Sequence, residues 1–154
     1  MLHNEDLIKW SSQLGQDSGQ IHTTFKLIKT IYCTNLEMVS TVVDNLERLK
    51  QDSFNRIKVP KFSYTREGMI VIQEIEFIKG CNIACYPKKY WDIIHEDIVL
   101  RDDDWTFADF NHSNFIVPYK ENTIYAVDLS SYGFHPDRYQ RNSQWIHHQK
   151  FNHL

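Results

Sequence analysis

The stretches FADFNHSNFIV (107–117) and IYAVD (124–128) decide how this chain is interpreted. Each contains a short run of apolar residues, and a polar, turn-like segment joins them, so together they predict a β-hairpin. Asp109 and Asn114 stand just before the first run, and Asp128 ends the second. Because antiparallel pairing brings the start of one strand next to the end of the other, we expect these three side chains at one end of the hairpin.

Asp109 and Asn114 are five positions apart, and Asp128 follows Asn114 by fourteen. This order resembles the protein-kinase-like superfamily, and most closely its aminoglycoside phosphotransferase and choline kinase branch, whose members carry H-G-D-x-x-x-x-N before a strand and a metal-binding Asp after an apolar strand. The resemblance implies that Asp109 is the catalytic residue, which orients the acceptor hydroxyl, and that Asn114 and Asp128 hold magnesium. Phosphoryl transfer needs such a carboxylate, and oxygen ligands that hold magnesium against the phosphates.

Upstream segments resemble further parts of this family in the same order. KLIK (26–29) is similar to the V-A-I-K strand of the family, which implies that Lys29 contacts the nucleotide phosphates. Such a lysine needs a carboxylate from the neighbouring helix. Glu47 is a better candidate for that role than Glu37, which we expect to cap the helix.

Two more segments complete the resemblance. EIEFIKG (74–80) resembles the hinge run of the family, so the backbone of Glu76 to Ile78 would meet an adenine edge. LGQDSG (14–19) is rich in turn residues and would be the phosphate loop, with Gly15 and Gly19 as its glycines.

Each of these residues also has a simpler interpretation. Asp109 and Asn114 can cap a turn or satisfy loop backbone, and Asp128 can be an ordinary residue at the end of a strand. Lys29 can be an exposed strand lysine and Glu47 a solvated helix residue, and the early glycines can form a plain turn. The functional interpretation therefore depends on the whole set occurring in order.

The rest of the chain predicts small elements around this hairpin. We expect a strand over 23–32, a helix over 34–50, a hairpin formed by 62–65 and 69–78 around Gly68, a helix over 87–100, and a partly helical tail over 136–154. Thr34 and Glu37 have the spacing of a capping box at the start of the first helix. The inward stripe of that helix is expected to comprise Leu36, Val39, Val43, Leu46 and Lys50. The expected anchors of the tail are Tyr139, Trp145 and Ile146.

These elements predict an α+β protein with a kinase-like, two-lobed fold. Residues 1–79 would form a small antiparallel sheet with one helix and the hinge at its end. Residues 80–154 would form an abbreviated helical lobe that carries the catalytic hairpin, and the two lobes together would make one compact unit.

Composition limits the class of protein. The 154 residues are 42% hydrophobic and 14% aromatic, enough for one globular core, and the formal net charge of −3 gives no bulk attraction to nucleic acid or anionic lipid. The N-terminus lacks the apolar run of a secretion signal and no stretch approaches the length of a membrane span, so we expect a cytoplasmic protein without a nucleic-acid or membrane partner. Three cysteines are too few for a disulfide scaffold, and Cys81 and Cys85 have no neighbouring ligands that would indicate a zinc site.

The sequence thus predicts an ATP- and magnesium-dependent phosphotransferase that moves the γ-phosphate to an unknown hydroxyl acceptor. The alternative is a pseudokinase that acts as a protein-binding, regulatory module. Phe107 stands where the family has His, which favours this alternative. Only 26 residues follow Asp128, too few for most of the acceptor-binding lobe of the family, and this favours it as well. We also expect a partner chain, or a second copy, to complete the shortened lobe.

Overall fold

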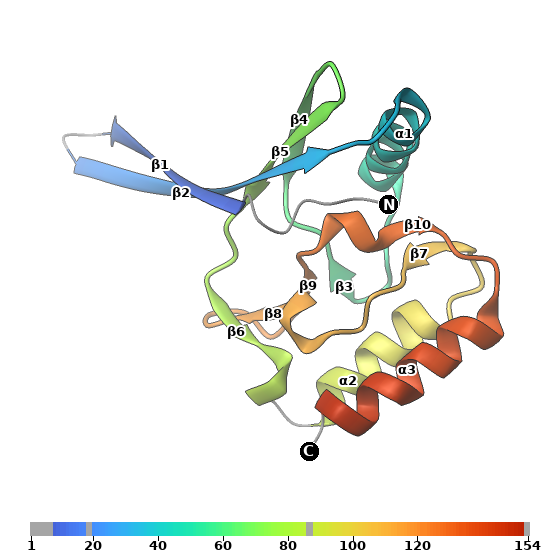
Figure 1. Ribbon diagram of the computed structural model, residues 1–154. Helices are drawn as coiled ribbons and strands as arrows, with labels where there is room; N and C mark the ends of the chain where they lie inside the picture. The colour runs from blue at the N-terminus through green and yellow to red at the C-terminus, as the bar shows by residue number, and fades with distance from the viewer. Residues whose placement is uncertain (1–7, 18–19, 86–87, 153–154) are drawn as a thin grey trace. The chain divides into compact units, whose positions relative to one another are not determined.

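The computed structural model describes residues 8–17, 20–85 and 88–152, and its mixed content of helix and strand confirms the α+β class. This part of the chain contains three α-helices and three small sheets (Figure 1). The chain divides into two compact units: the first unit is Met1–Asp44 with Pro60–Phe77, and the second unit is Asn45–Val59 with Ile78–Leu154. Within the described ranges, no helix combines the length and the apolar character that crossing a bilayer requires.

The first unit is built on an antiparallel sheet with the strand order β1-β2-β5-β4 (Figure 1). Its strands are β1 (Ile8–Asp17), β2 (Gln20–Tyr32), β4 (Phe62–Glu67) and β5 (Ile70–Glu76). Ile31 of β2 lies opposite Val71 of β5, and both side chains are fully buried. The strand predicted over 23–32 and the hairpin predicted around Gly68 are therefore confirmed.

A two-residue turn, Gly68-Met69, connects β4 to β5, because Glu67 pairs directly with Ile70. Gly68 has a φ of 61°, in the left-handed region where any residue with a Cβ is strained. Two-residue hairpin turns favour glycine at this first position for the same reason. The glycine between two strand-like runs was thus a reliable signal for the hairpin.

The first helix, α1 (Leu36–Gln51), starts with a different cap from the one predicted. Asn35 caps it, since its Oδ1 accepts the N–H of Met38 at 2.8 Å. Thr34 instead places its N–H and Oγ1 3.4 Å from the sulfur of Met38. The predicted capping box of Thr34 and Glu37 is therefore wrong. Asparagine caps a helix at least as well as threonine and stands one position nearer to the first turn.

The buried face of α1 is also rotated from the predicted one. Its buried residues are Val39, Val42, Leu46 and Leu49. The predicted members Leu36 and Lys50 are exposed, Leu36 to 61%, and Val43 is half-buried. Both sets recur at helical spacing, so the periodicity predicts a helix without choosing between two adjacent stripes.

The second unit contains two small sheets. One has the order β3-β9-β8-β6 and the other pairs β7 with β10. Their strands are β3 (Ile57–Lys58), β6 (Gly80–Asn82), β7 (Trp105–Phe107), β8 (Phe115–Pro118), β9 (Ile124–Ala126) and β10 (Tyr132–Phe134). β8 and β9 are antiparallel, with Phe115 opposite Ala126, which confirms the hairpin predicted from the two opening stretches.

Helices complete the second unit. α2 (Lys88–Ile94) continues into a π-helical turn (His95–Val99), which confirms most of the helix predicted over 87–100, although Pro87 lies outside the described residues. α3 (Arg138–Asn152) lies beside α2 (Figure 1). Short 3₁₀ turns occur at Ile83–Cys85, His112–Asn114 and Leu129–Ser131.

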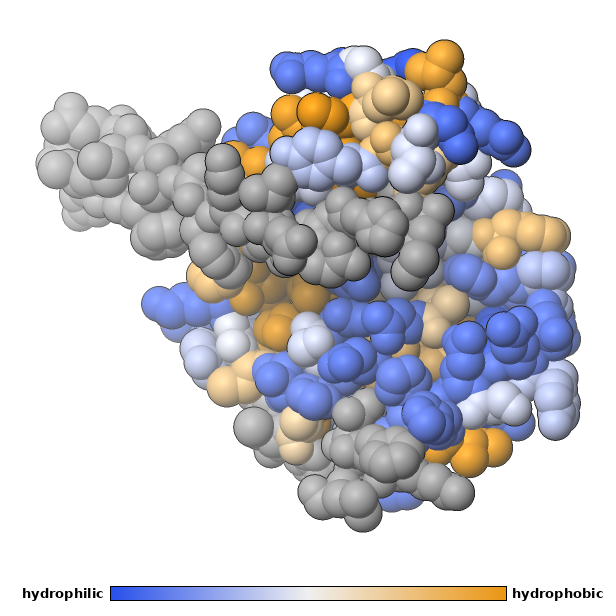
Figure 2. All heavy atoms as spheres, in the orientation of Figure 1, coloured by the Kyte–Doolittle hydropathy of each residue, from blue (hydrophilic) through white to orange (hydrophobic). Residues whose placement is uncertain are grey.

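The contact between α2 and α3 is aromatic. Trp145 of α3 packs on Trp91 and on Phe110, with ring centroids 5.6 Å apart in both pairs. Trp145 is therefore the tail anchor that the sequence predicts. Tyr139 and Ile146, predicted as further anchors, are 82% and 52% exposed, so that part of the prediction is wrong. The surface over α3 is mostly hydrophilic (Figure 2), and the helix is held by buried Trp145 together with buried Arg141.

Candidate functional site

Strand β7 brings Asp109 to the surface. The N–H of Ala108 donates to the carbonyl of Ser131 at 3.2 Å and extends the pairing of β7 with β10 by one residue. The next side chain, Asp109, is exposed. Phe107, which stands where the kinase-like motif of the sequence analysis would have histidine, is buried between the rings of Phe54 and Tyr132, at 5.4 and 5.5 Å between centroids. Packing, rather than a histidine hydrogen bond, thus supports the loop at this position.

The loop from Asp109 to Asn114 is held by its own polar side chains. Asp109 Oδ1 accepts the N–H of Asn111 at 3.2 Å, and Asn111 Oδ1 accepts the N–H of Ser113 at 3.0 Å. Asn114 Nδ2 donates back to the carbonyl of Asp109 at 3.4 Å. Asn114 thereby closes the loop on Asp109 and leaves its amide oxygen as the acceptor atom of the side chain.

Asp128 reaches the same place from the other strand. The N–H of Val127 donates to the carbonyl of Asn114 at 2.9 Å, one step beyond the paired residues of β8 and β9. Asp128 Oδ1 accepts the N–H of Ser130 at 3.2 Å and caps the turn that follows. A path of hydrogen bonds therefore connects Asp109, Asn114 and Val127, the residue before Asp128.

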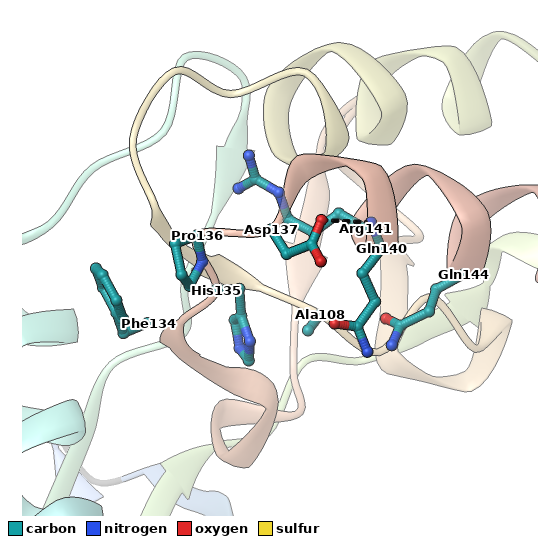
Figure 3. Close-up of a pocket in the computed structure, with 8 residues that line it drawn as sticks. All are labelled: Ala108, Phe134, His135, Pro136, Asp137, Gln140, Arg141 and Gln144. Atoms are coloured by element: carbon teal, nitrogen blue, oxygen red, sulfur yellow. Dashed lines mark hydrogen bonds between the residues drawn. The ribbon is translucent and has the colours of Figure 1, made fainter.

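Two neighbouring cavities open beside Asp109. The larger has a volume of about 390 Å³, and the smaller, drawn in Figure 3, about 220 Å³. Ala108, His135 and Gln144 line both, so the cavities are adjacent. Asp109 lines the larger one, together with Ser130 and Ser131. The candidate catalytic carboxylate thus borders a hollow that is largely open to solvent.

His135 lines both cavities, and its hydrogen bonding defines the tautomer of its ring. Its Nε2 lies 3.1 Å from the carbonyl of Ser131, which can only accept, so Nε2 carries the proton and Nδ1 is left as an acceptor. Burial lowers the pKa of His135 below its ordinary value of 6.5, and the positive charge of Arg141 lowers it further. The ring is therefore neutral at pH 7.

Arg141 is a buried cation at the edge of the smaller cavity. Its Nη1 and Nη2 donate to the carbonyls of Asp103 and Arg101, both at 3.2 Å, and its guanidinium points away from the amides of Gln140 and Gln144 (Figure 3). Burial is the main cause that lowers the pKa of Arg141 below its usual value. Its hydrogen bonds tie α3 to the segment before β7.

The residues at the end of the hairpin suit a magnesium ion in their chemistry. Asn114 and Asp128 offer amide and carboxylate oxygens, which magnesium prefers, and magnesium usually retains several waters instead of taking a full set of protein ligands. Among the described residues, no group of three or more His, Cys, Asp or Glu side chains is arranged to hold a metal ion. A magnesium held here would thus depend on Asn114 and Asp128 together with substrate oxygens.

The other residues singled out from the sequence lie apart from this loop in the chain. Lys29 is on β2, opposite Gln73, and Glu76 exchanges two hydrogen bonds with the backbone of Lys61, at 2.8 and 3.1 Å. Gly15 is paired with His22 inside β1, so residues 14–17 form a strand where the sequence predicted a loop. Gly19 lies outside the described residues.

Two candidates fall at the start of the second unit. Glu47 is exposed on α1, and its Oε1 lies 3.8 Å from Lys50 Nζ. Ile78 is half-buried between β5 and β6, in the segment where the chain passes from one unit to the other.

Sequence reasoning missed His135 and Gln144 as residues of the site. They follow Asp109 by 26 and 35 positions, and only the pairing of β7 with β10 and the docking of α3 bring them to it. The local sequence around each residue does not indicate that His135 and Gln144 lie close to Asp109 in the folded chain.

Comparison of the chain with protein-family models finds no match, and a search of curated proteins finds none either.

Proposed function

We propose that this protein is an ATP- and magnesium-dependent phosphotransferase with a reduced, kinase-like two-lobed fold. The observation that supports this best is the hydrogen-bond path from the carbonyl of Asp109 through Asn114 to Val127, the residue before Asp128. The cavity beside Asp109 adds the space that an acceptor needs. Both features belong to the second unit alone.

In this proposal Asp109 orients the acceptor hydroxyl and receives its proton as the phosphoryl group transfers. Asn114 and Asp128 hold a magnesium ion, which when bound neutralises charge on the phosphates. Transfer between oxygens needs little covalent participation from the protein, so accurate positioning is most of the task. The backbone hydrogen bonds accepted by Asp109 and Asp128 fix each carboxylate before substrate arrives, which lowers the cost of reorganisation.

The nucleotide-binding residues stay predictions of the resemblance. They are Lys29, Glu47, Glu76, Ile78, Gly15 and Gly19. Alanine at Lys29 should weaken ATP binding if that residue contacts the phosphates, and titration of ATP into the Lys29→Ala variant measures it.

Thermal unfolding with and without ATP and magnesium tests the proposal. A ligand at about 100 times its Kd stabilises the folded state by about 2.7 kcal/mol, which raises Tm by about 5–10 °C for a chain of this size. Asp128→Ala should remove this rise. Glu121→Ala, an exposed carboxylate in the turn at the far end of the same hairpin, should keep it. If millimolar ATP and magnesium leave the Tm of the wild type unchanged, the proposal fails.

A second test separates catalysis from binding. Asp109→Ala should keep the rise in Tm, because the residue does not hold the metal in this proposal, and should abolish transfer of labelled γ-phosphate. Equal transfer by wild type and Asp109→Ala would exclude Asp109 as the catalytic residue.

A protein-binding module without catalysis is the second candidate. Tyr139 and Ile146 favour it, because they are seven positions apart on α3, hence on one face of the helix, and are strongly exposed. Replacing both with serine should abolish association with a partner, or self-association detected by light scattering, and should leave ATP-dependent stabilisation unchanged. A compact monomer with nucleotide-dependent transfer would favour the phosphotransferase.

A further inference from the structure

We propose that the paired cavities beside Asp109 bind an uncharged, polyhydroxylated small molecule of about monosaccharide size as the acceptor. The proposal rests on the proposed function for its reactive end, because Asp109 is the group that meets the hydroxyl. It goes further in naming the chemistry of the acceptor. Four features of the cavity walls carry it: unused amides, a fixed histidine acceptor, the sign of the charges and an apolar ring.

The amides come from one face of α3. Gln140 and Gln144 are four positions apart, so they lie one above the other on the helix, and their amide groups sit side by side in the smaller cavity, on the side of Ala108 (Figure 3). Neither side-chain amide hydrogen-bonds to another residue in the described part of the chain. Gln140 is exposed and Gln144 half-buried, so both amides are accessible to a ligand, and each provides two donors and an acceptor. Two adjacent amides match vicinal hydroxyls, each of which donates and accepts.

His135 adds an acceptor whose orientation is fixed. Because Nε2 donates to Ser131, the Nδ1 lone pair is available, and the ring lines both cavities. A neutral imidazole accepts a hydrogen bond from a hydroxyl but offers no charge to an ion. The serines at positions 130 and 131 also line the larger cavity, which adds neutral polar surface to its wall.

The charges around the cavity disfavour an ionic acceptor. The carboxylates at the walls are Asp109 and Asp137, both of which repel an anion, and Asp137 Oδ1 accepts the N–H of Gln140 at 3.0 Å. The charge of Arg141 acts at His135 and makes the site less favourable for a second cation. The guanidinium of Arg141 donates from Nη1 and Nη2 to backbone carbonyls and its Nε is buried, so an anion in the larger cavity would meet the carboxylate of Asp109 instead.

The shape and the apolar part of the cavity walls suit the ring of a sugar. Phe134, 56% exposed, lines the smaller cavity and gives an apolar surface for the C–H groups of a sugar ring. The larger cavity, about 390 Å³, is largely open to solvent, so a small molecule bound there would keep one side in water. A polyol placed against Phe134 and the glutamine amides would extend toward Asp109 through the shared wall.

Saturation-transfer NMR without nucleotide tests the inference. The probes are a panel of neutral hexoses, pentoses and cyclitols, with the matched amino sugars and sugar acids. At least one neutral member should bind, and more tightly than its amino and acidic counterparts. Gln144→Leu should weaken that binding about five- to tenfold through the lost hydrogen bond. Asn142→Leu, an exposed amide on the same helix outside the cavity, should leave it unchanged. Gln140→Leu serves as a second variant should Gln144→Leu fail to fold.

The outcomes are distinct from those of the ATP experiment. Binding of the amino sugar or sugar acid in preference to the neutral one overturns the inference, and so does a panel in which nothing binds. Neutral binding that Gln144→Leu and Gln140→Leu both leave unchanged also overturns it. Sugar binding together with no response to ATP supports the cavity assignment and rejects only the phosphotransferase.

Discussion

Replacing Asp52 with alanine should strongly lower the stability of the second unit, because Asp52 holds two partners that are themselves shielded from water. Its Oδ1 accepts from Arg101 Nη2 at 2.6 Å, and its Oδ2 accepts from the hydroxyl of Tyr132 at 2.5 Å. The side chains of Asp52 and Arg101 are only 13% and 14% exposed. Burial raises the pKa of Tyr132 far above its ordinary value, and the carboxylate raises it further, so the phenol remains a donor.

The size of the effect follows from what the substitution leaves behind. Arg101 keeps one counter-ion, Asp103 at 3.5 Å, and Tyr132 loses the acceptor of its hydroxyl. Breaking a fully buried ion pair costs about 3–5 kcal/mol, and a stranded donor about 1–3 kcal/mol. Because Asp103 still compensates part of the positive charge of Arg101, we expect a loss of about 3 kcal/mol in the free energy of unfolding. For a chain of this length that lowers Tm by about 6–12 °C.

Urea and thermal unfolding of Asp52→Ala against Asp102→Ala provide the assay. Asp102 also pairs with an arginine, Arg138 at 3.4 Å, but its side chain is 99% exposed. Surface pairs of this kind contribute about 0–1 kcal/mol, so the control should unfold nearly as the wild type does. Equal losses in the two variants would refute the view that burial gives the Asp52 network its strength.

Two further outcomes are expected. Gly80→Ala should cost about 1–3 kcal/mol in urea unfolding, because a Cβ at Gly80 would lie 2.1 Å from the carbonyl oxygen of Val117 on the paired strand; an unchanged midpoint would contradict the close approach of β6 and β8. Since the folded state lowers the pKa of His135 below 6.5, the unfolded state binds its proton first, so the stability that His135 contributes is present above pH 6.5 and is lost as the pH falls through the folded pKa. The free energy of unfolding of wild type should therefore decline more steeply than that of His135→Gln below pH 6.5, and parallel curves would be evidence against it.

The elements that the sequence predicts best are those whose signals are local. Gly68 between two strand-like runs, and the apolar pairs of β8 and β9, each specify a hairpin through turn chemistry and alternation, and both form. Asn114 directly precedes β8 and Asp128 follows β9, as the order of the residues predicts. The hydrogen bonds from Val127 to Asn114 and from Asn114 to Asp109 follow from that local order.

Local sequence patterns do not specify which of two similar helix caps, or which of two similar helix faces, the tertiary structure uses. Thr34 and Asn35 are both good caps, and two stripes of α1 have the same spacing, so packing decides. The cavity beside Asp109 depends on the pairing of β7 with β10 and on the docking of Trp145, contacts between segments far apart in the chain. Residues such as Gln144 therefore become part of the site only when the fold is known.

Paramagnetic broadening by manganese in the presence of ATP tests most directly whether this loop gathers around a divalent cation. We expect selective loss of the amide signals of residues 110–114 and 127–131 at low Mn²⁺. This loss should be abolished in Asp128→Ala and retained in Glu121→Ala. Broadening centred on another part of the chain, or the same broadening in Asp128→Ala, would contradict the assignment of Asn114 and Asp128 as the metal ligands.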